Sequence, residues 1–133
     1  HLEFGLQTAV EDEGRAIQRR NRMAAVAPLM RGLTDRGISY EVSLIYGLPG
    51  QTVESFRQSI QFVRDNGCDR ITAWPLMLLR GTELMAQRQQ WEFEERAEGR
   101  FGIPVVTRSR SFSERDWETM KEIAEGLAPN ARV

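Results

Sequence analysis

The sequence predicts an α/β fold with a parallel sheet, followed by a helical segment. Three strand-like segments, at residues 2–6, 38–46 and 70–76, are separated by segments whose apolar residues recur at helical spacing. Glycine-containing turns mark the changes from one kind of segment to the next. Because each strand is followed by a helix before the next strand begins, we expect neighbouring strands to run parallel.

The first unit is an alternating strand that leads into a helical segment. The alternation gives this strand an apolar face with Leu2, Phe4 and Leu6, and a polar, open face with Glu3, Gly5 and Gln7. Residues 11–36 are predicted to be helical. A proline inside a helix removes one hydrogen bond and clashes with the preceding turn, so Pro28 is expected to kink this helix or divide it in two.

The second unit has the clearest boundaries. Gly37 is typical of a residue just past the end of a helix, and residues 38–46 alternate as a strand. Thr52 is a suitable N-cap for a helix that ends at Asn66 and Gly67. One face of this helix carries the apolar residues Val53, Phe56, Ile60 and Val63.

The pattern becomes weaker after the third strand. We expect a short helix near residues 83–90, a polar stretch that contains Trp91 and Phe93, and an extended segment around residues 103–107. The last helix is better defined, with Ser113 as its cap. Its apolar residues have helical spacing and are predicted to be core contacts: Trp117, Met120, Ile123, Ala124 and Leu127.

Composition limits the classes of function. A chain of 133 residues is about one domain, and a net charge of −1 with 28% charged residues does not indicate a nucleic-acid-binding protein. No apolar run approaches the roughly 20 residues of a membrane span, and no signal segment opens the chain. We therefore expect a cytoplasmic protein without nucleic-acid or membrane partners.

Metal chemistry is not expected from these residues alone. Cys68 is the single cysteine and His1 the single histidine, so the chain cannot form an internal disulfide or supply a cysteine cluster for iron and sulfur. Cys68 is interpreted as a small, half-buried residue at the end of a helix. His1 stands at a terminus, where a catalytic role is not expected.

The loop at residues 47–52, Gly-Leu-Pro-Gly-Gln-Thr, has two interpretations. A glycine-rich turn that leads from a strand into a helix can bind phosphate with its backbone N–H groups. The phosphate-binding pattern of nucleoside triphosphatases, however, has a lysine before the hydroxyl residue, and Gln51 stands there. The alternative is a tight turn in which Gly47 and Gly50 adopt unusual backbone angles and Pro49 adds stiffness.

Four motifs in order resemble the radical S-adenosylmethionine (SAM) superfamily. They are Gly-Leu-Gln-Thr at residues 5–8, Asn-Arg at 21–22, the loop at 47–52, and Pro-Leu-Met-Leu-Leu-Arg-Gly-Thr at 75–82. In parallel barrels the functional atoms gather at the carboxyl ends of strands, where three of these motifs fall. The resemblance implies a partial TIM-type barrel, with three parallel βα units from the second half of a radical SAM barrel, followed by the C-terminal helical segment.

The resemblance also implies a set of SAM-binding residues. Gln7 would bind the methionyl or ribose part of SAM, and Arg22 its carboxylate, for which a guanidinium offers a fork of donors. Ser43 stands where relatives often have Asp, which weakens a contact to the ribose or amino group. The remaining implied residues are Ile45 and Gly47 near the adenine, Met77 at its edge through the backbone, and Glu3 near the amino group or a substrate.

The chemistry of the superfamily needs more than this chain contains. The resemblance implies that a 4Fe-4S cluster cleaves SAM reductively to a 5′-deoxyadenosyl radical in the full-length protein, and the cluster cysteines would lie upstream of residue 1. The chain begins in a strand without an initiator Met, so we expect an internal or C-terminal piece that is not catalytic by itself. Arg80 stands where relatives tend to have proline, which loosens that loop.

Two branches of the superfamily remain open. Glu3, the Pro75-Leu76 segment and the tail at 111–117 are most similar to the cobalamin-binding branch, which implies cobalamin in a separate domain. The loop at 47–52 also resembles the coproporphyrinogen dehydrogenase branch. We expect residues 1–90 to form the C-terminal half of the barrel and residues 91–133 an extension that packs on it. The substrate is not indicated.

Alternatives from other classes also remain. The chain is alternatively a stand-alone α/β module that binds a phosphorylated ligand at residues 47–52, or a non-catalytic interaction domain with Trp91, Phe93 and Phe101 as exposed anchors. A metal-independent aldolase barrel would need a Schiff-base lysine, for which Lys121 is poorly placed. Because a partial barrel has open sheet edges, we expect the chain to dimerise or exchange elements.

Overall fold

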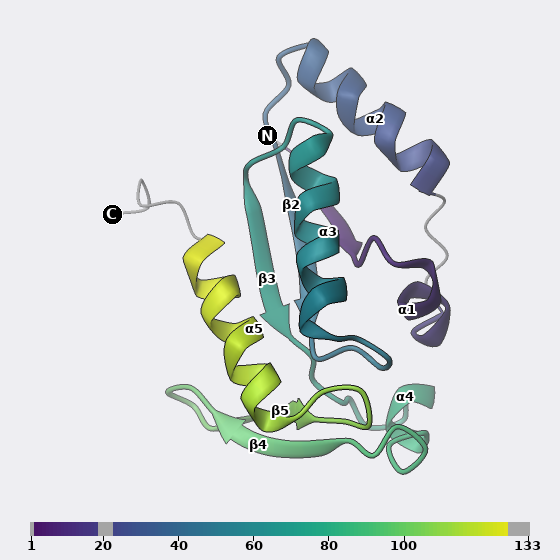
Figure 1. Ribbon diagram of the computed structural model, residues 1–133, viewed down its shortest axis with the longest axis vertical. Coiled ribbons are helices and arrows are strands. Elements are labelled where there is room, and N and C mark those ends of the chain that lie inside the picture. The colour runs from purple at the N-terminus through teal and green to yellow at the C-terminus, as the bar shows by residue number, and fades with distance from the viewer. Residues whose placement is uncertain (1, 19–22, 128–133) are drawn as a thin grey trace.

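The computed structural model describes residues 2–18 and 23–127 as five strands and five helices (Figure 1). The first part of the chain holds β1 (Leu2–Gln7), α1 (Glu11–Ala16), α2 (Met23–Asp35), β2 (Tyr40–Tyr46), α3 (Val53–Asp65) and β3 (Ile71–Pro75). The second part holds α4 (Glu83–Ala86), β4 (Glu94–Glu98), β5 (Ile103–Arg108) and α5 (Glu114–Leu127). In the described residues, no helix is both long enough and apolar enough to cross a membrane.

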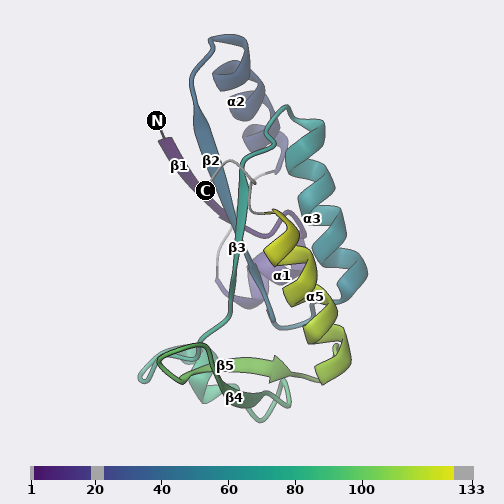
Figure 2. The same ribbon diagram turned by 90° about the vertical axis from the view of Figure 1, so that its left-hand side faces the viewer.

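The main sheet has three parallel strands in the order β1-β2-β3, as the sequence predicted. Figure 2 shows α2, α3 and α5 to one side of these strands. The side chains of β2 that face the helices are buried: Tyr40, Val42, Leu44 and Tyr46. The residues between them are only half-buried, so the alternation expected for this strand is confirmed and the second face of the sheet lies open.

The first strand follows its predicted pattern with one irregularity. Leu6 is fully buried and Phe4 is half-buried against the core, but Leu2 at the strand's start is exposed. The pairing with β2 is regular from Leu2 to Gly5 and then shifts, so that Gln7 pairs with Leu44. Gln7 also has a left-handed φ of 70°. A β-bulge of this kind redirects the strand at its carboxyl end.

The division of the first helical segment differs from the prediction. The segment does form two helices, but α2 continues through Pro28 and the break precedes it. The helix α1 ends at Ala16 with Ile17 as its C-cap, and Gln18 just beyond has a left-handed φ of 58°, which cannot continue a right-handed helix. The missing N–H of Pro28 removes one hydrogen bond from α2, which is otherwise intact.

The second helix unit agrees with its sequence signals. Thr52 accepts a hydrogen bond from the backbone N–H of Ser55, and the Ser55 hydroxyl accepts one from the N–H of Thr52, which is a capping box. The helix α3 then buries Phe56, Ile60 and Val63 against the sheet and ends at Asp65. Gly37 has the left-handed φ of 68° that was expected where the preceding helix ends.

The segment after β3 contains more strand than the sequence predicted. The helix α4 is shorter than residues 83–90, and the polar stretch beyond it forms β4, which pairs antiparallel with β5. Only β5 was expected. The β4 sequence, Glu-Glu-Arg-Ala-Glu, has no alternating apolar face, so its pairing depends on β5 rather than on its own propensity.

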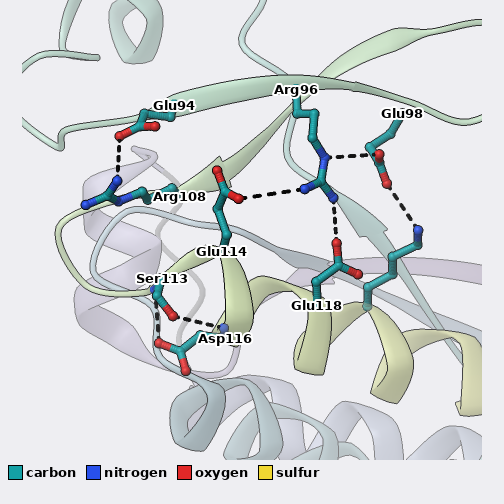
Figure 3. A network of polar contacts seen from close by, with 9 residues as sticks. Glu94, Arg96, Glu98, Arg108, Ser113, Glu114, Asp116 and Glu118 are labelled. Atoms are coloured by element: carbon teal, nitrogen blue, oxygen red, sulfur yellow. Dashed lines mark hydrogen bonds and ion pairs between the residues drawn. The ribbon is translucent and has the colours of Figure 1, made fainter.

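Ion pairs attach the β4–β5 hairpin to α5 (Figure 3). Arg96 on β4 contacts Glu98 at 3.2 Å and also reaches Glu114 and Glu118 on α5, while Lys121 on α5 contacts Glu98 at 3.1 Å. Beneath these charges Trp117 is buried, as predicted, and both cations lie over its ring. The helix α5 in turn packs on β3 and α3.

Candidate functional site

The open face of the sheet carries a polar pocket. Its volume is about 270 Å³, and it is lined by Glu3, Glu41, Ser43, Thr72 and Trp74. The register explains this set, because Glu3 lies opposite Glu41, and Ser43 lies between Gly5 and Thr72. Side chains opposite one another in neighbouring strands project to the same face. Two carboxylates and two hydroxyls therefore share this face, which the sequence predicted to be polar and open in β1.

Gln7 stands beyond this row, at the carboxyl end of β1. Gln7 was predicted to share the polar face of β1 with Glu3 because side chains alternate along a strand. The bulge after Gly5 interrupts this alternation, and Gln7 is half-buried. Bulges next to binding sites commonly set the direction of a side chain. The bulge, which gives no signal in the sequence beyond Gly5, is thus the feature that determines where Gln7 lies.

The loop at residues 47–52 is closed from within by Gln51. Gly47 and Gly50 have φ angles of 93° and 78°, as expected for a tight turn. The fully buried Gln51 accepts hydrogen bonds through Oε1 from the N–H groups of Gly47 at 2.6 Å and Leu48 at 3.1 Å, and its Nε2 donates to the Ile45 carbonyl. Two of the backbone donors that a phosphate would need are therefore already bound.

A buried carboxyl group joins this loop to the end of β1. The Thr8 hydroxyl donates to Glu13 at 2.8 Å, and the hydroxyls of Thr8 and Ser59 lie 3.3 Å apart. Burial raises the pKa of Glu13, although hydrogen bonds from Ser55, Thr8 and Gln51 oppose the rise. Glu13 is not among the site residues predicted from the sequence, because an acidic run at the start of a helix is normally exposed to solvent.

The other implied site residues lie in different surroundings. Ile45 is half-buried and stands opposite Trp74 in the register. A Cβ on Gly47 would lie 3.2 Å from the Val106 carbonyl oxygen, which is tighter than an ordinary contact, and the φ of 93° would strain any side chain there. Met77 is exposed and lines pockets at the carboxyl end of the sheet rather than the polar pocket with Glu3. Arg22, like the whole Asn-Arg motif, lies outside the described residues.

The described residues offer no metal centre. They contain no group of three or more His, Cys, Asp or Glu side chains placed to hold a metal ion. Cys68 is buried, and its Sγ lies 3.5 Å from the Arg70 carbonyl oxygen. Burial raises the pKa of the Cys68 thiol, which disfavours the thiolate needed for a metal or a nucleophilic reaction.

The proposed aromatic anchors are mostly not available. Trp91 and Phe93 are half-buried, the indole of Trp91 donates to Gln87 at 3.2 Å, and Phe93 packs against the core. Phe101, between β4 and β5, is exposed. Of the three anchors expected from the sequence, only Phe101 is thus presented to solvent.

Comparisons with known proteins find similarity in structure but not in sequence. No family model matches the chain, and no curated protein does. Coproporphyrinogen III oxidase (HemN) from Escherichia coli, described as a radical SAM enzyme, has 22% identity and a TM-score of 0.64 over 94% of this chain and 25% of its own. The archaeal Elp3 protein of Methanocaldococcus infernus has 18% identity and a TM-score of 0.66 over 96% of this chain and 27% of its own.

These likenesses concern the fold. At 22% and 18% identity they show that this chain is built like part of each of these larger proteins, and it spans about a quarter of their length. The predicted α/β fold is confirmed, and the three parallel strands with helices on one face agree with a partial barrel. The activity of the protein to which these residues belong is a separate question.

Proposed function

We propose that this chain is part of a radical SAM enzyme and supplies one wall of its SAM pocket. The observation that carries the proposal is the open, polar face of β1, β2 and β3 in a fold that matches part of a radical SAM enzyme. In parallel barrels this face is the interior, and ligands bind towards the carboxyl ends of the strands. Gln7, Gly47 and Met77 all stand at or just beyond those ends.

The residues on this face suit the polar groups of SAM. The carboxylates of Glu3 and Glu41 are acceptors for an ammonium group, and the hydroxyls of Ser43 and Thr72 can bond to ribose hydroxyls. Gln7 would add an amide at the strand end. Ile45 and the backbone at Gly47 and Met77 would contact the adenine, and Arg22 the carboxylate of the methionyl part.

The 4Fe-4S cluster that such an enzyme requires does not fit these residues. One buried cysteine cannot replace the thiolate ligands of the cluster. The proposal therefore assigns the cluster, and with it the cleavage of SAM, to other parts of the full-length protein, while this chain alone is inactive. The branch of the superfamily and any separate cobalamin domain follow only from the motifs named above.

The rival phosphate-binding function has less support. A phosphate at the loop of residues 47–52 would have to displace the Gln51 amide from Gly47 and Leu48, and would leave the Ile45 carbonyl without its donor. An interaction domain based on aromatic anchors retains Phe101 only. The polar pocket requires no such rearrangement.

Binding of SAM to the chain tests the pocket. Calorimetric titration should show weak but saturable binding of SAM. Gln7→Asn should reduce it, because asparagine tolerates the left-handed backbone and only shortens the side chain. Gln61→Asn is the control, since it makes the same change at an exposed position on α3. Equal loss of binding in both variants, or no binding to the wild-type chain, would contradict the assignment of Gln7.

The activity is tested in the protein encoded by the complete gene. Its coding sequence should contain three closely spaced cysteines upstream of these residues. The anaerobically reconstituted protein, reduced with dithionite, should release 5′-deoxyadenosine from SAM. A gene without these cysteines, or a reduced and cluster-loaded protein that leaves SAM intact, refutes the proposed chemistry.

A further inference from the structure

A second, apolar pocket lies beside the carboxyl end of β3. Its volume is about 500 Å³, and its walls come from the sheet, the β4–β5 hairpin and α5. Figures 1 and 2 show the hairpin crossing below the end of β3 while α5 rises beside that strand. The Val106 N–H on β5 donates to the Leu76 carbonyl at 2.9 Å, which fixes the hairpin against the sheet. The principal lining residues are Tyr46, Trp74, Met77, Ile103, Val105 and Trp117.

The lining of this pocket selects for an uncharged, apolar group. Three exposed apolar side chains line this pocket: Trp74, Met77 and Ile103, which are 61%, 46% and 47% exposed. Exposed apolar side chains that cluster together often mark a binding site, whereas single ones scattered over a surface do not. Glu98 and Lys121 also line the pocket, but they pair with each other at 3.1 Å. Because these two charges already compensate each other, the described residues of the lining offer an ionic ligand no unpaired charge of opposite sign.

The aromatic residues of the lining narrow the ligand further. Trp74 is exposed and offers a flat surface on which a planar ring can stack. The rings of Tyr46 and Trp117, 5.7 Å apart, are buried and complete the aromatic part of the lining. The pocket therefore suits an uncharged group with an aromatic ring.

The apolar pocket adjoins the polar one. Trp74 lines both, since its side chain stands at the end of the polar row and at the edge of the sheet. We propose that the apolar pocket binds an uncharged aromatic or polycyclic portion of the substrate. The assignment to a substrate rests on the proposed function, because a radical formed from SAM in the polar pocket would react with a group held next to it. Binding itself does not depend on that chemistry.

Titration of the chain with 2-acetylnaphthalene tests the pocket directly. This probe is uncharged and has two fused aromatic rings. The chain has three tryptophans, so nitrogen–proton correlation spectra give three indole signals. We expect saturable shifts of the signals of Trp74 and Trp117 but not of Trp91, with a dissociation constant below about 1 mM. The anion 2-naphthoate should bind at least about tenfold more weakly.

Two matched variants locate the binding. Ile103→Glu places a carboxylate in the pocket and should weaken 2-acetylnaphthalene about tenfold or more. Leu29→Glu changes a residue of similar exposure on α2, away from the pocket, and should leave the affinity unchanged. Equal affinity in both variants, shifts confined to Trp91, or equal binding of 2-naphthoate would overturn the assignment.

A titration of the same variants with SAM separates the two proposals. Ile103→Glu should retain the SAM affinity of the wild type, because Ile103 does not line the polar pocket. Probe binding without SAM binding would refute the proposed function and leave the apolar site in place. SAM binding without probe binding would refute the apolar site alone.

Discussion

Gln51→Ala is the substitution with the largest expected effect on the loop at residues 47–52. The wild-type side chain is fully buried and makes three hydrogen bonds, to the N–H groups of Gly47 and Leu48 and to the Ile45 carbonyl. Each buried group left without a partner costs about 1–3 kcal/mol. Because the loop can relax and admit water, we expect a total loss of about 4 kcal/mol in the free energy of unfolding.

Urea denaturation followed by circular dichroism and tryptophan emission measures this loss. Gln51→Glu keeps an acceptor for both N–H groups but places a buried carboxylate against the Ile45 carbonyl and beside Glu13, so it should also lose stability. Gln61→Ala is the control, because Gln61 is exposed and its amide reaches only Asp65, one turn further along α3. A loss below about 1 kcal/mol for Gln51→Ala would show that the loop does not depend on this amide.

Three further predictions concern burial, backbone and association. Because burial raises the pKa of Glu13, the folded protein keeps the Glu13 proton at pH values where the unfolded chain, with a pKa near 4.5, has lost it. The stability that this proton binding contributes is complete below about pH 4.5 and falls as the pH rises towards the folded-state pKa. Glu13→Gln should remove this decline in urea titrations between about pH 4 and pH 8, and an unchanged slope would contradict it. Gly47→Ala should lower the unfolding free energy by about 1–3 kcal/mol in the same urea assay, because its φ is 93° and a Cβ meets the Val106 carbonyl, whereas Gly50→Ala has the strain without the contact and should lose less. Light scattering should show self-association through the open sheet edges, and a clean monomer at high concentration would count against it.

Elements with strong local signals were predictable. The strand β2 alternates without interruption, and α3 carries its own capping box and apolar stripe, so neither depends on distant residues for its identity. The unusual backbone angles of Gly47 and Gly50 were predictable for the same reason, because a tight turn needs them locally. Glu3 and Ser43 were placed on one face by alternation alone, and they line one pocket.

Features that arise from contacts across the chain could not be predicted. The strand β4 is polar and exists because β5 pairs with it. Glu13 is buried beside Thr8, which follows β1 and also contacts Ser59 on α3, and nothing in the local sequence of Glu13 separates it from Glu11 and Asp12. The bulge at Gln7 similarly comes from the pairing of β1 with β2.

The structure also changes what the family-like motifs can mean. In the first motif Leu6 is buried in the core and Thr8 bonds to Glu13 and the Val10 N–H. In the loop at residues 47–52, Gln51 closes the turn and Thr52 caps α3.

These residues therefore have structural roles, which a segment with this fold would need whether or not it binds a ligand. Gln7 differs, because it is half-buried at a bulge beside the polar pocket, and the described residues give it no side-chain hydrogen bond. A motif residue that the fold itself requires is little evidence for SAM binding. If Gln7→Asn loses SAM binding but keeps its stability, a role of Gln7 in folding cannot explain the loss. That comparison, rather than the number of matching motif residues, decides whether the segment is a binding wall or only a barrel fragment.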